Sequence, residues 1–221
     1  MIDIASPLRL RLDSAALLHN WRWLAKAGGA EAGAAIKADG YGLGAREVMR
    51  HLADAGCRFF FVANWVEAAA LMPLPAGVSL SVLHGVGDAD MIAARTLPVR
   101  PVLISVEQVA RWRAAGEGRA CDVMIDTGMN RLGVRVEEAR GGALNGIMVE
   151  TLLSHLASAD EDSPQTERQL EAFAAIRDAI PARRYSLANS AGICLGSDYG
   201  FDLTRPGLAL YGGVPRAEAE G

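Results

Sequence analysis

The chain has 221 residues, of which 51% are hydrophobic and 22% are charged, and its formal net charge is −4. This composition predicts a folded protein with a substantial core, and the dispersed basic residues argue against nucleic acid or an anionic membrane as a partner. The sequence has no apolar run long enough to span a bilayer and no secretory signal pattern, which predicts a cytoplasmic protein. Its three scattered cysteines predict neither a disulfide framework nor a zinc site.

Short β-rich runs alternate along the chain with amphipathic helical patterns. Asn64 and Ser105 are expected to cap helices, because a Glu or Gln follows each of them three residues later. The apolar stripe before Gly28-Gly29 predicts an earlier helix that ends there, and Ser163-Pro164 predicts the start of a later one. The expected strands are Leu8–Leu12, Ala34–Lys37, Phe59–Ala63, Val78–Leu83, Val102–Ile104, Cys121–Ile125, Ile147–Leu153, Arg184–Leu187 and Leu208–Tyr211.

Strands that alternate with helices predict parallel pairing with right-handed crossovers. When Leu8–Leu12 is set aside, eight strands remain, and eight is the number that closes a barrel. The pattern therefore predicts a (β/α)8 TIM-like barrel, with an open doubly wound sheet as the alternative.

Polar residues stand at the carboxyl ends of the expected strands, which form the rim where barrel enzymes place their sites. We interpret Asn64 and Ser105 as helix caps, and we assign no role to His84. The rim residues are Lys37, Asn64, His84, Ser105, Asp126, Ser154 with His155, Asn189 with Ser190, and Arg205.

Lys37 stands where the apolar run Ala34-Ala35-Ile36 meets a glycine-rich loop. A charged ammonium is costly to bury in a strand unless it is paired. Lys37 is therefore either a surface residue at the start of a loop or an amine held for chemistry. Unprotonated lysine amines form Schiff bases with aldehydes.

Four segments carry motifs that are unlike plain connectors. Together they closely resemble the alanine racemases, a family of pyridoxal-phosphate-dependent enzymes with an α/β barrel. The motifs occur in order over essentially the whole chain, and the first two are highly specific as a pair. The segments are Lys37-Ala38-Asp39-Gly40-Tyr41-Gly42-Leu43-Gly44, Asp126-Thr127-Gly128-Met129-Asn130-Arg131-Leu132-Gly133, Ser154-His155-Leu156-Ala157-Ser158-Ala159-Asp160, and Asn189-Ser190-Ala191 with Arg205-Pro206-Gly207-Leu208-Ala209-Leu210-Tyr211-Gly212.

The resemblance implies a catalytic set of Lys37, Arg131 and His155. Lys37 would hold pyridoxal 5′-phosphate as a Schiff base and would then act as one of two bases for α-proton transfer between L-alanine and D-alanine. Arg131 would contact the phenolic oxygen of the cofactor and position the substrate carboxylate. His155 would lie behind the cofactor, in a hydrogen-bond network that reaches Arg205.

The resemblance also implies which groups hold the cofactor phosphate. These are the hydroxyls of Tyr41 and Ser190 and the backbone amides of Gly207 and Leu208, because glycine lets backbone donors approach an anion closely.

In the same resemblance Arg205 faces the pyridine nitrogen. Arginine stays protonated, so it donates a hydrogen bond but cannot give up a proton. The ring is then a weaker electron sink, which favours racemisation over transamination. We interpret Asp126 and Asp160 as loop-shaping carboxylates, and no metal is implied.

The chain departs from the family pattern in two places. Many members carry a lysine, reported as carbamylated, seven residues before the arginine that corresponds to Arg131, and here that position is Met124. The family also has a C-terminal β-rich domain that supplies a tyrosine as the second base. We therefore expect a fragment, in which residues 1–12 hold a strand that belongs with the missing domain, residues 13–214 form the cofactor-binding barrel, and residues 215–221 begin an interdomain linker.

Two alternatives remain open at this stage. One is a single-domain protein that binds pyridoxal phosphate and buffers it without catalysis, and the other is a broad-specificity amino-acid racemase. For the racemase, the resemblance implies alanine as the substrate and a homodimer for the full-length protein.

Overall fold

The apolar runs form short strands that pair in parallel, in nearly the order in which they occur along the chain. A computed structural model describes residues 10–219. Every ladder in the described residues is parallel. The strands are β1 (Glu31–Ala32), β2 (Ala34–Ala35), β3 (Phe59–Val62), β4 (Ser79–Val82), β5 (Arg100–Leu103), β6 (Cys121–Asp126), β7 (Val134–Arg135), β8 (Val149–Leu153), β9 (Arg184–Ser186) and β10 (Leu203–Thr204).

The strands close into a barrel because the first barrel strand pairs on both sides. This strand is divided at Gly33. Its first half, β1, pairs with β10, and its second half, β2, pairs with β3. The sheet then runs through β4, β5, β6 and β8 to β9, while β7 pairs with β6 off this path. Backbone hydrogen bonds from Asp202 N to Tyr185 O and from Arg205 N to Ala188 O join the β9 and β10 segments. The predicted barrel is confirmed, and the open doubly wound sheet is excluded.

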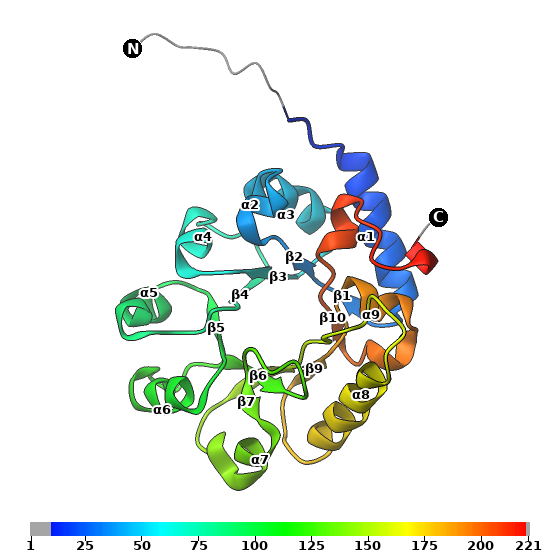
Figure 1. Cartoon of the computed structure of the whole chain (residues 1–221). Coiled ribbons are helices and arrows are strands. Elements are labelled where there is room, and N and C mark those ends of the chain that lie inside the picture. Colours follow the sequence, from blue (N-terminus) through cyan, green and yellow to red (C-terminus); the bar gives the residue numbers. More distant parts are fainter. Residues whose placement is uncertain (1–9, 220–221) are drawn as a thin grey trace, which may run out of the picture.

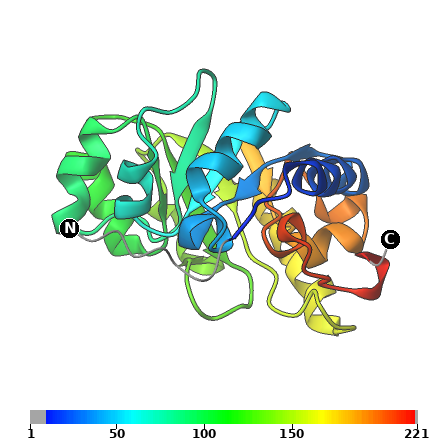
Figure 2. The same cartoon turned by 90° about the horizontal axis from the view of Figure 1, so that it is seen from above.

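Helices and helical turns surround the strands, as the view down the barrel in Figure 1 shows. In this view and in the rotated view of Figure 2, α1 lies beside the turn η4, and Asn20 Nδ2 donates to Leu210 O at 3.2 Å. The α-helices are α1 (Ser14–Gly28), α2 (Lys37–Tyr41), α3 (Ala45–Asp54), α4 (Trp65–Ala70), α5 (Met91–Thr96), α6 (Val106–Ala115), α7 (Val136–Glu138), α8 (Pro164–Arg177) and α9 (Ser190–Cys194), and the turns are η1 (Asp88–Asp90), η2 (Ala139–Ala143), η3 (Ser197–Tyr199), η4 (Leu208–Tyr211) and η5 (Ala217–Ala219).

The expected helix caps are present. The side chains of Asn64, Ser105 and Ser163 each accept a backbone N–H from the first turn of the helix that follows, and α1 ends at Gly29 in the left-handed conformation. The reciprocal hydrogen bond from the third helical residue to the cap N–H is absent at Asn64 and Ser105. The carboxylate of Glu67 accepts from Ala63 N, and Gln108 Oε1 accepts from Ile104 N.

One expected strand was wrong, and another lies partly outside the described residues. Leu208–Tyr211 is the 3-10 turn η4, and the last barrel strand is β10, which lies before Arg205. A run of four apolar residues is compatible with a buried strand or a buried helical turn, so periodicity alone does not separate them. Of the expected strand Leu8–Leu12, residues 10–12 are not in a strand, and residues 8 and 9 lie outside the described residues.

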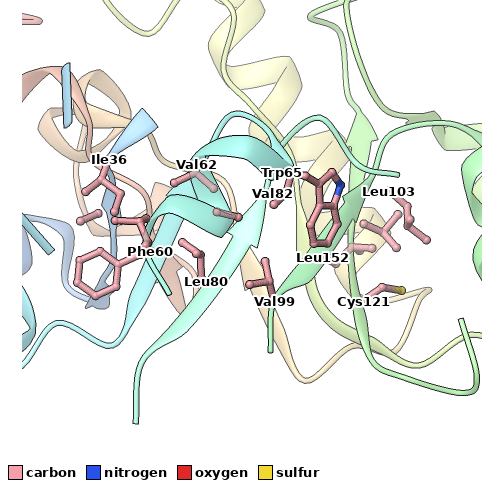
Figure 3. Close-up of a cluster of buried hydrophobic side chains, with 14 of the residues drawn as sticks. Ile36, Phe60, Val62, Trp65, Leu80, Val82, Val99, Leu103, Cys121 and Leu152 are labelled. Carbon is pink, nitrogen blue, oxygen red and sulfur yellow. The ribbon is translucent and has the colours of Figure 1, made fainter. Parts of the chain in front are cut away.

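The alternation of side chains along the strands divides the core into two regions. On β3, Phe60 and Val62 belong to the cluster between the strands and the helices (Figure 3), whereas Phe59 and Phe61 belong to a separate cluster with Met124 of β6. All four β3 residues are buried. The strand is therefore apolar on both faces, as expected where a sheet is covered by helices on the outside and filled by side chains within.

We predict that Gly33→Ala destabilises the barrel at its closure. A Cβ at this position would lie 2.9 Å from Phe59 O and 3.2 Å from Thr204 O, so strand backbone would have to move. Urea denaturation should give a free energy of unfolding lower by about 1–3 kcal/mol. In the control Gly141→Ala the new Cβ meets no atom within 4 Å, and a change within about 0.5 kcal/mol is expected. Equal effects of the two substitutions would contradict the prediction.

Candidate active site

One cavity of about 470 Å³ lies at the carboxyl ends of the barrel strands. Its wall is built by residues from loops far apart in the sequence, which parallel closure brings to the same rim. All eight residues proposed from the sequence for the site line this cavity. They are Lys37, Tyr41, Arg131, His155, Ser190, Arg205, Gly207 and Leu208.

Lys37 lies just before a turn of left-handed helix and is separated from β2 by Ile36 alone. Ala38, Asp39, Gly40 and Tyr41 have φ values of 51°, 51°, 64° and 55°. For a non-glycine residue this conformation costs about 1–2 kcal/mol. The turn must therefore be held by its surroundings.

Hydrogen bonds from both sides hold this turn. Within it, Gly40 N donates to Ile36 O at 2.8 Å and Gly42 N donates to Ala38 O at 2.9 Å. The carboxylate of Asp39 accepts from Ala45 N at 2.8 Å and so ties the turn to the start of α3. The loop geometry at Lys37 is thus specified by the chain itself.

Tyr41, Ser190 and Gly207 form one corner of the cavity. Ser190 Oγ accepts from Gly207 N at 3.0 Å and from Ala209 N at 3.2 Å. The Tyr41 ring stacks on Tyr211 with 4.6 Å between the ring centroids. A Cβ on residue 207 would lie 2.4 Å from the Tyr41 hydroxyl oxygen, so glycine is required for this close approach.

Arg205 is buried in the barrel beside this corner. Its terminal nitrogens donate to Ser186 Oγ and to the carbonyls of Ser154 and Leu187. Burial lowers the pKa of Arg205 to about 10, and the charge of Asp122 opposes that shift. The guanidinium therefore stays protonated at neutral pH. Its Nε donates to no other residue within 10–219, so this N–H is available to a ligand in the cavity.

Arg131 and His155 lie on neighbouring loops of the rim. Arg131 is exposed and makes no hydrogen bond or ion pair with another described residue, and Met124 lines the cavity without a charge. Burial, and then the positive charges of Arg205, Arg131 and Lys37, lower the pKa of His155 to about 3. His155 is therefore neutral at physiological pH.

The charges around the cavity favour an anionic ligand. Three cationic side chains line it, those of Lys37, Arg131 and Arg205, against the single carboxylate of Asp160. Asp126 shapes its loop as expected, because its Oδ1 accepts from Gly128 N and Asn130 N. Residues 10–219 contain no cluster of His, Cys, Asp or Glu suited to a metal, and none of their helices is long and apolar enough to cross a membrane.

Sequence reasoning missed Gln169, which joins two loops of the site. This side chain of α8 is fully buried. It accepts from Ala157 N at 2.9 Å and donates to His155 O at 2.9 Å and to Thr127 Oγ1 at 3.3 Å. A glutamine in an amphipathic helix gives no local signal of such a role, because its partners belong to loops before the helix.

Comparisons with known proteins agree with this geometry. The family model described as "Alanine racemase, N-terminal domain" matches residues 12–215. An alanine racemase of Methylobacterium nodulans is 46% identical over 96% of this chain and 60% of that protein. Catabolic and biosynthetic alanine racemases of Agrobacterium fabrum are 42% and 41% identical over 94% of this chain.

Solved structures give the same result. The crystal structure of alanine racemase from Bartonella henselae with covalently bound pyridoxal phosphate superposes with a TM-score of 0.86 at 34% identity, over 92% of this chain and 60% of that one. The biosynthetic alanine racemase of Pseudomonas aeruginosa gives a TM-score of 0.80 at 34% identity, over 92% of this chain and 59% of that chain. The chain spans about 60% of the length of the first relatives it matches.

We predict that His155 makes the stability of the protein fall as the pH falls. Its pKa is about 3 in the folded protein and about 6.5 in an unfolded chain. Between these values the unfolded state binds a proton that the folded state does not, so the free energy of unfolding decreases with decreasing pH. Urea denaturation at pH 7 and pH 5 should show a loss of about 1–2 kcal/mol that is absent in His155→Gln. The same pH dependence in both proteins would contradict this assignment.

Proposed function

Because the chain belongs to the family of alanine racemase N-terminal domains, we propose that it binds pyridoxal 5′-phosphate at Lys37 and forms the barrel part of an enzyme that interconverts L-alanine and D-alanine. The observation that carries this proposal is the convergence of Lys37, Ser190 and Arg205 on one cavity. These residues offer an amine, a hydroxyl and a fixed cation. Those are the groups that an aldehyde, a phosphate and a pyridine nitrogen require.

The Tyr41 corner fits a phosphate group. Ser190 Oγ already accepts two backbone N–H groups, so its own hydrogen is left to donate. The Tyr41 hydroxyl and the Leu208 amide have no acceptor among the described residues, and residues Tyr41 and Leu208 both line the cavity. We infer that these three donors hold the phosphate, and that Gly207 N supports Ser190 while glycine makes room for Tyr41.

When bound, pyridoxal phosphate supplies an aldehyde that forms a Schiff base with an amine and a ring that makes the α-hydrogen of a bound amino acid acidic. Lys37 would provide the amine that holds the cofactor and that accepts or returns the α-proton. Arg205 lines the cavity and would donate a hydrogen bond to the ring nitrogen while keeping its own proton, since its pKa of about 10 is well above neutral pH. This hydrogen bond without proton transfer favours racemisation over transamination.

Arg131 and His155 complete the proposed site. The guanidinium of Arg131 suits the phenolic oxygen and the substrate carboxylate, and Met124 offers it no charge from the wall of the cavity. Neutral His155 adds no positive charge next to Arg205. It therefore acts as a hydrogen-bonding group behind the ring rather than as a proton donor.

We also propose the wider organisation of the protein. Residues 13–214 form the cofactor-binding unit, with residues 1–12 and 215–221 leading to other parts of the enzyme. Leu132, Leu208 and Val214 line the cavity and are 44%, 48% and 53% exposed. Such an apolar rim is typical of a surface that another domain or subunit covers, which supports a homodimer for the full-length enzyme.

We predict that the cofactor attaches to Lys37. The chain has only two lysines, and the other is Lys26 in the last turn of α1. After incubation with pyridoxal phosphate and reduction with borohydride, mass spectrometry should find the adduct on the peptide that contains Lys37. Lys37→Ala should abolish it and Lys26→Ala should not. An adduct that persists in Lys37→Ala would overturn the proposed function.

We predict that the chain with bound pyridoxal phosphate exchanges the α-hydrogen of alanine with solvent but inverts the configuration of the α-carbon slowly. Of the four tyrosines, only Tyr41 lines the cavity, and it is assigned to the phosphate. One base suffices for exchange, whereas inversion needs a base on each face, and a positioned base contributes about 10²–10⁴-fold. Proton NMR in deuterated water should therefore show exchange that is faster than inversion by about 100-fold.

This measurement also separates the alternatives. A protein that only stores the cofactor would bind it at Lys37 and show no exchange above free pyridoxal phosphate. Exchange of L-arginine as fast as that of alanine would favour a broad-specificity racemase. Rapid inversion by the isolated chain would contradict the assignment of a single base.

A further inference from the structure

Glu67 of α4 joins the loop that begins at Lys37 to the loop that follows β3. One carboxylate oxygen accepts from Ala38 N at 3.1 Å, and the other accepts from Ala63 N at 2.8 Å. Ala38 is the residue after Lys37, so the amide plane between them is held from outside its own loop. Helix α4 lies next to α2 in Figure 1, which makes this contact across neighbouring loops possible.

Gln108 of α6 makes the equivalent contact on the next pair of strands. Its Oε1 accepts from Ile104 N at 3.1 Å, at the end of β5, and its Nε2 donates to His84 O at 3.2 Å, after β4. His84 lies outside the wall of the cavity. Glu67 and Gln108 therefore join neighbouring loops in the same way, Glu67 beside the cavity and Gln108 away from it.

The two side chains match the groups that they face. Glu67 faces two N–H donors, which a carboxylate can satisfy with its two acceptor oxygens. Gln108 faces one N–H and one carbonyl, which require an acceptor and a donor, as a carboxamide provides. An exchange of Glu for Gln at either position keeps the volume but loses one hydrogen bond. The two positions therefore form a matched pair.

The turn that Glu67 holds is the strained one. Ala38, Asp39 and Tyr41 are left-handed residues without the freedom of glycine. Lys37 directly precedes this turn, and Tyr41, whose hydroxyl oxygen lies against Gly207, stands near its end. A bond at Ala38 N therefore fixes the direction of the amine and of one proposed phosphate donor together.

We propose that Glu67 is a positioning residue that orients Lys37 for the cofactor aldehyde through Ala38 N. This inference rests on the proposed function, because it concerns the affinity of the same site. Glu67 does not line the cavity. It therefore acts through the backbone and touches neither the cofactor nor the substrate.

The test compares Glu67→Gln with Gln108→Glu in the whole chain. For each protein we would measure the dissociation constant of pyridoxal phosphate by absorbance titration, the reduced adduct on Lys37 by mass spectrometry, and the melting temperature. Both substitutions should lower the melting temperature to a similar degree. Glu67→Gln should weaken cofactor binding about tenfold, which corresponds to one lost hydrogen bond, and Gln108→Glu should change it less than about twofold.

The outcomes distinguish a failure of the proposed function from a failure of the role proposed for Glu67. Failure of the unsubstituted chain to form an adduct on Lys37 refutes the proposed function itself. If that chain binds cofactor and Glu67→Gln binds it equally well, only the role of Glu67 is refuted. Should Glu67→Gln fail to fold, Glu67→Ala, which leaves both amides to water, is measured in the same way. If neither variant folds while Gln108→Glu does, Glu67 serves general stability and the proposal is overturned.

Discussion

Two backbone hydrogen bonds between the first and last barrel strands hold the halves of the site together. Gly33 N donates to Thr204 O at 2.9 Å, and Ala35 N donates to Pro206 O at 2.8 Å. These bonds set the end of β2 beside the segment after β10. The left-handed turn after β2 then brings Tyr41 against Gly207. The position of the Lys37 amine relative to the buried Arg205 guanidinium therefore follows from the closure of the barrel. This closure depends on the narrow space at Gly33.

The rim is joined in neighbouring pairs of loops by polar side chains from the surrounding helices. Glu67 joins the loops after β2 and β3, Gln108 those after β4 and β5, and Gln169 those after β6 and β8. Ser190 joins the start of α9 to the loop after β10. Each side chain offers the acceptors or donors that its partners require, so the backbone groups that leave the strands remain satisfied. The side chains on these loops are thereby tied to the strands and helices of the barrel.

Much of the fold was predictable from the sequence. The barrel follows from the alternation of strand and helix patterns. Motifs in strict order also predicted eight residues that the structure brings together on one cavity, and the roles of these residues stay predictions. Leu203–Thr204 was missed because two residues carry no periodicity, whereas Leu208–Tyr211 has the apolar character of a strand and forms a turn. The contact of Glu67 with Ala38 was missed because spacing along one helix shows only local partners. Hydrogen bonds to the backbone of a distant loop depend on how the strands are packed.

The divided first strand has a consequence for how the protein is made. The ribosome releases β1 long before it releases β10, so the early half of the first strand has no pairing partner during most of synthesis. The later half can pair with β3 at once, because domains form from the N-terminus as the chain emerges. The cavity forms only after β10 has emerged, since its two sides come from the earliest and latest strands of the described barrel. A chain stalled before that point would expose an unpaired edge at β1.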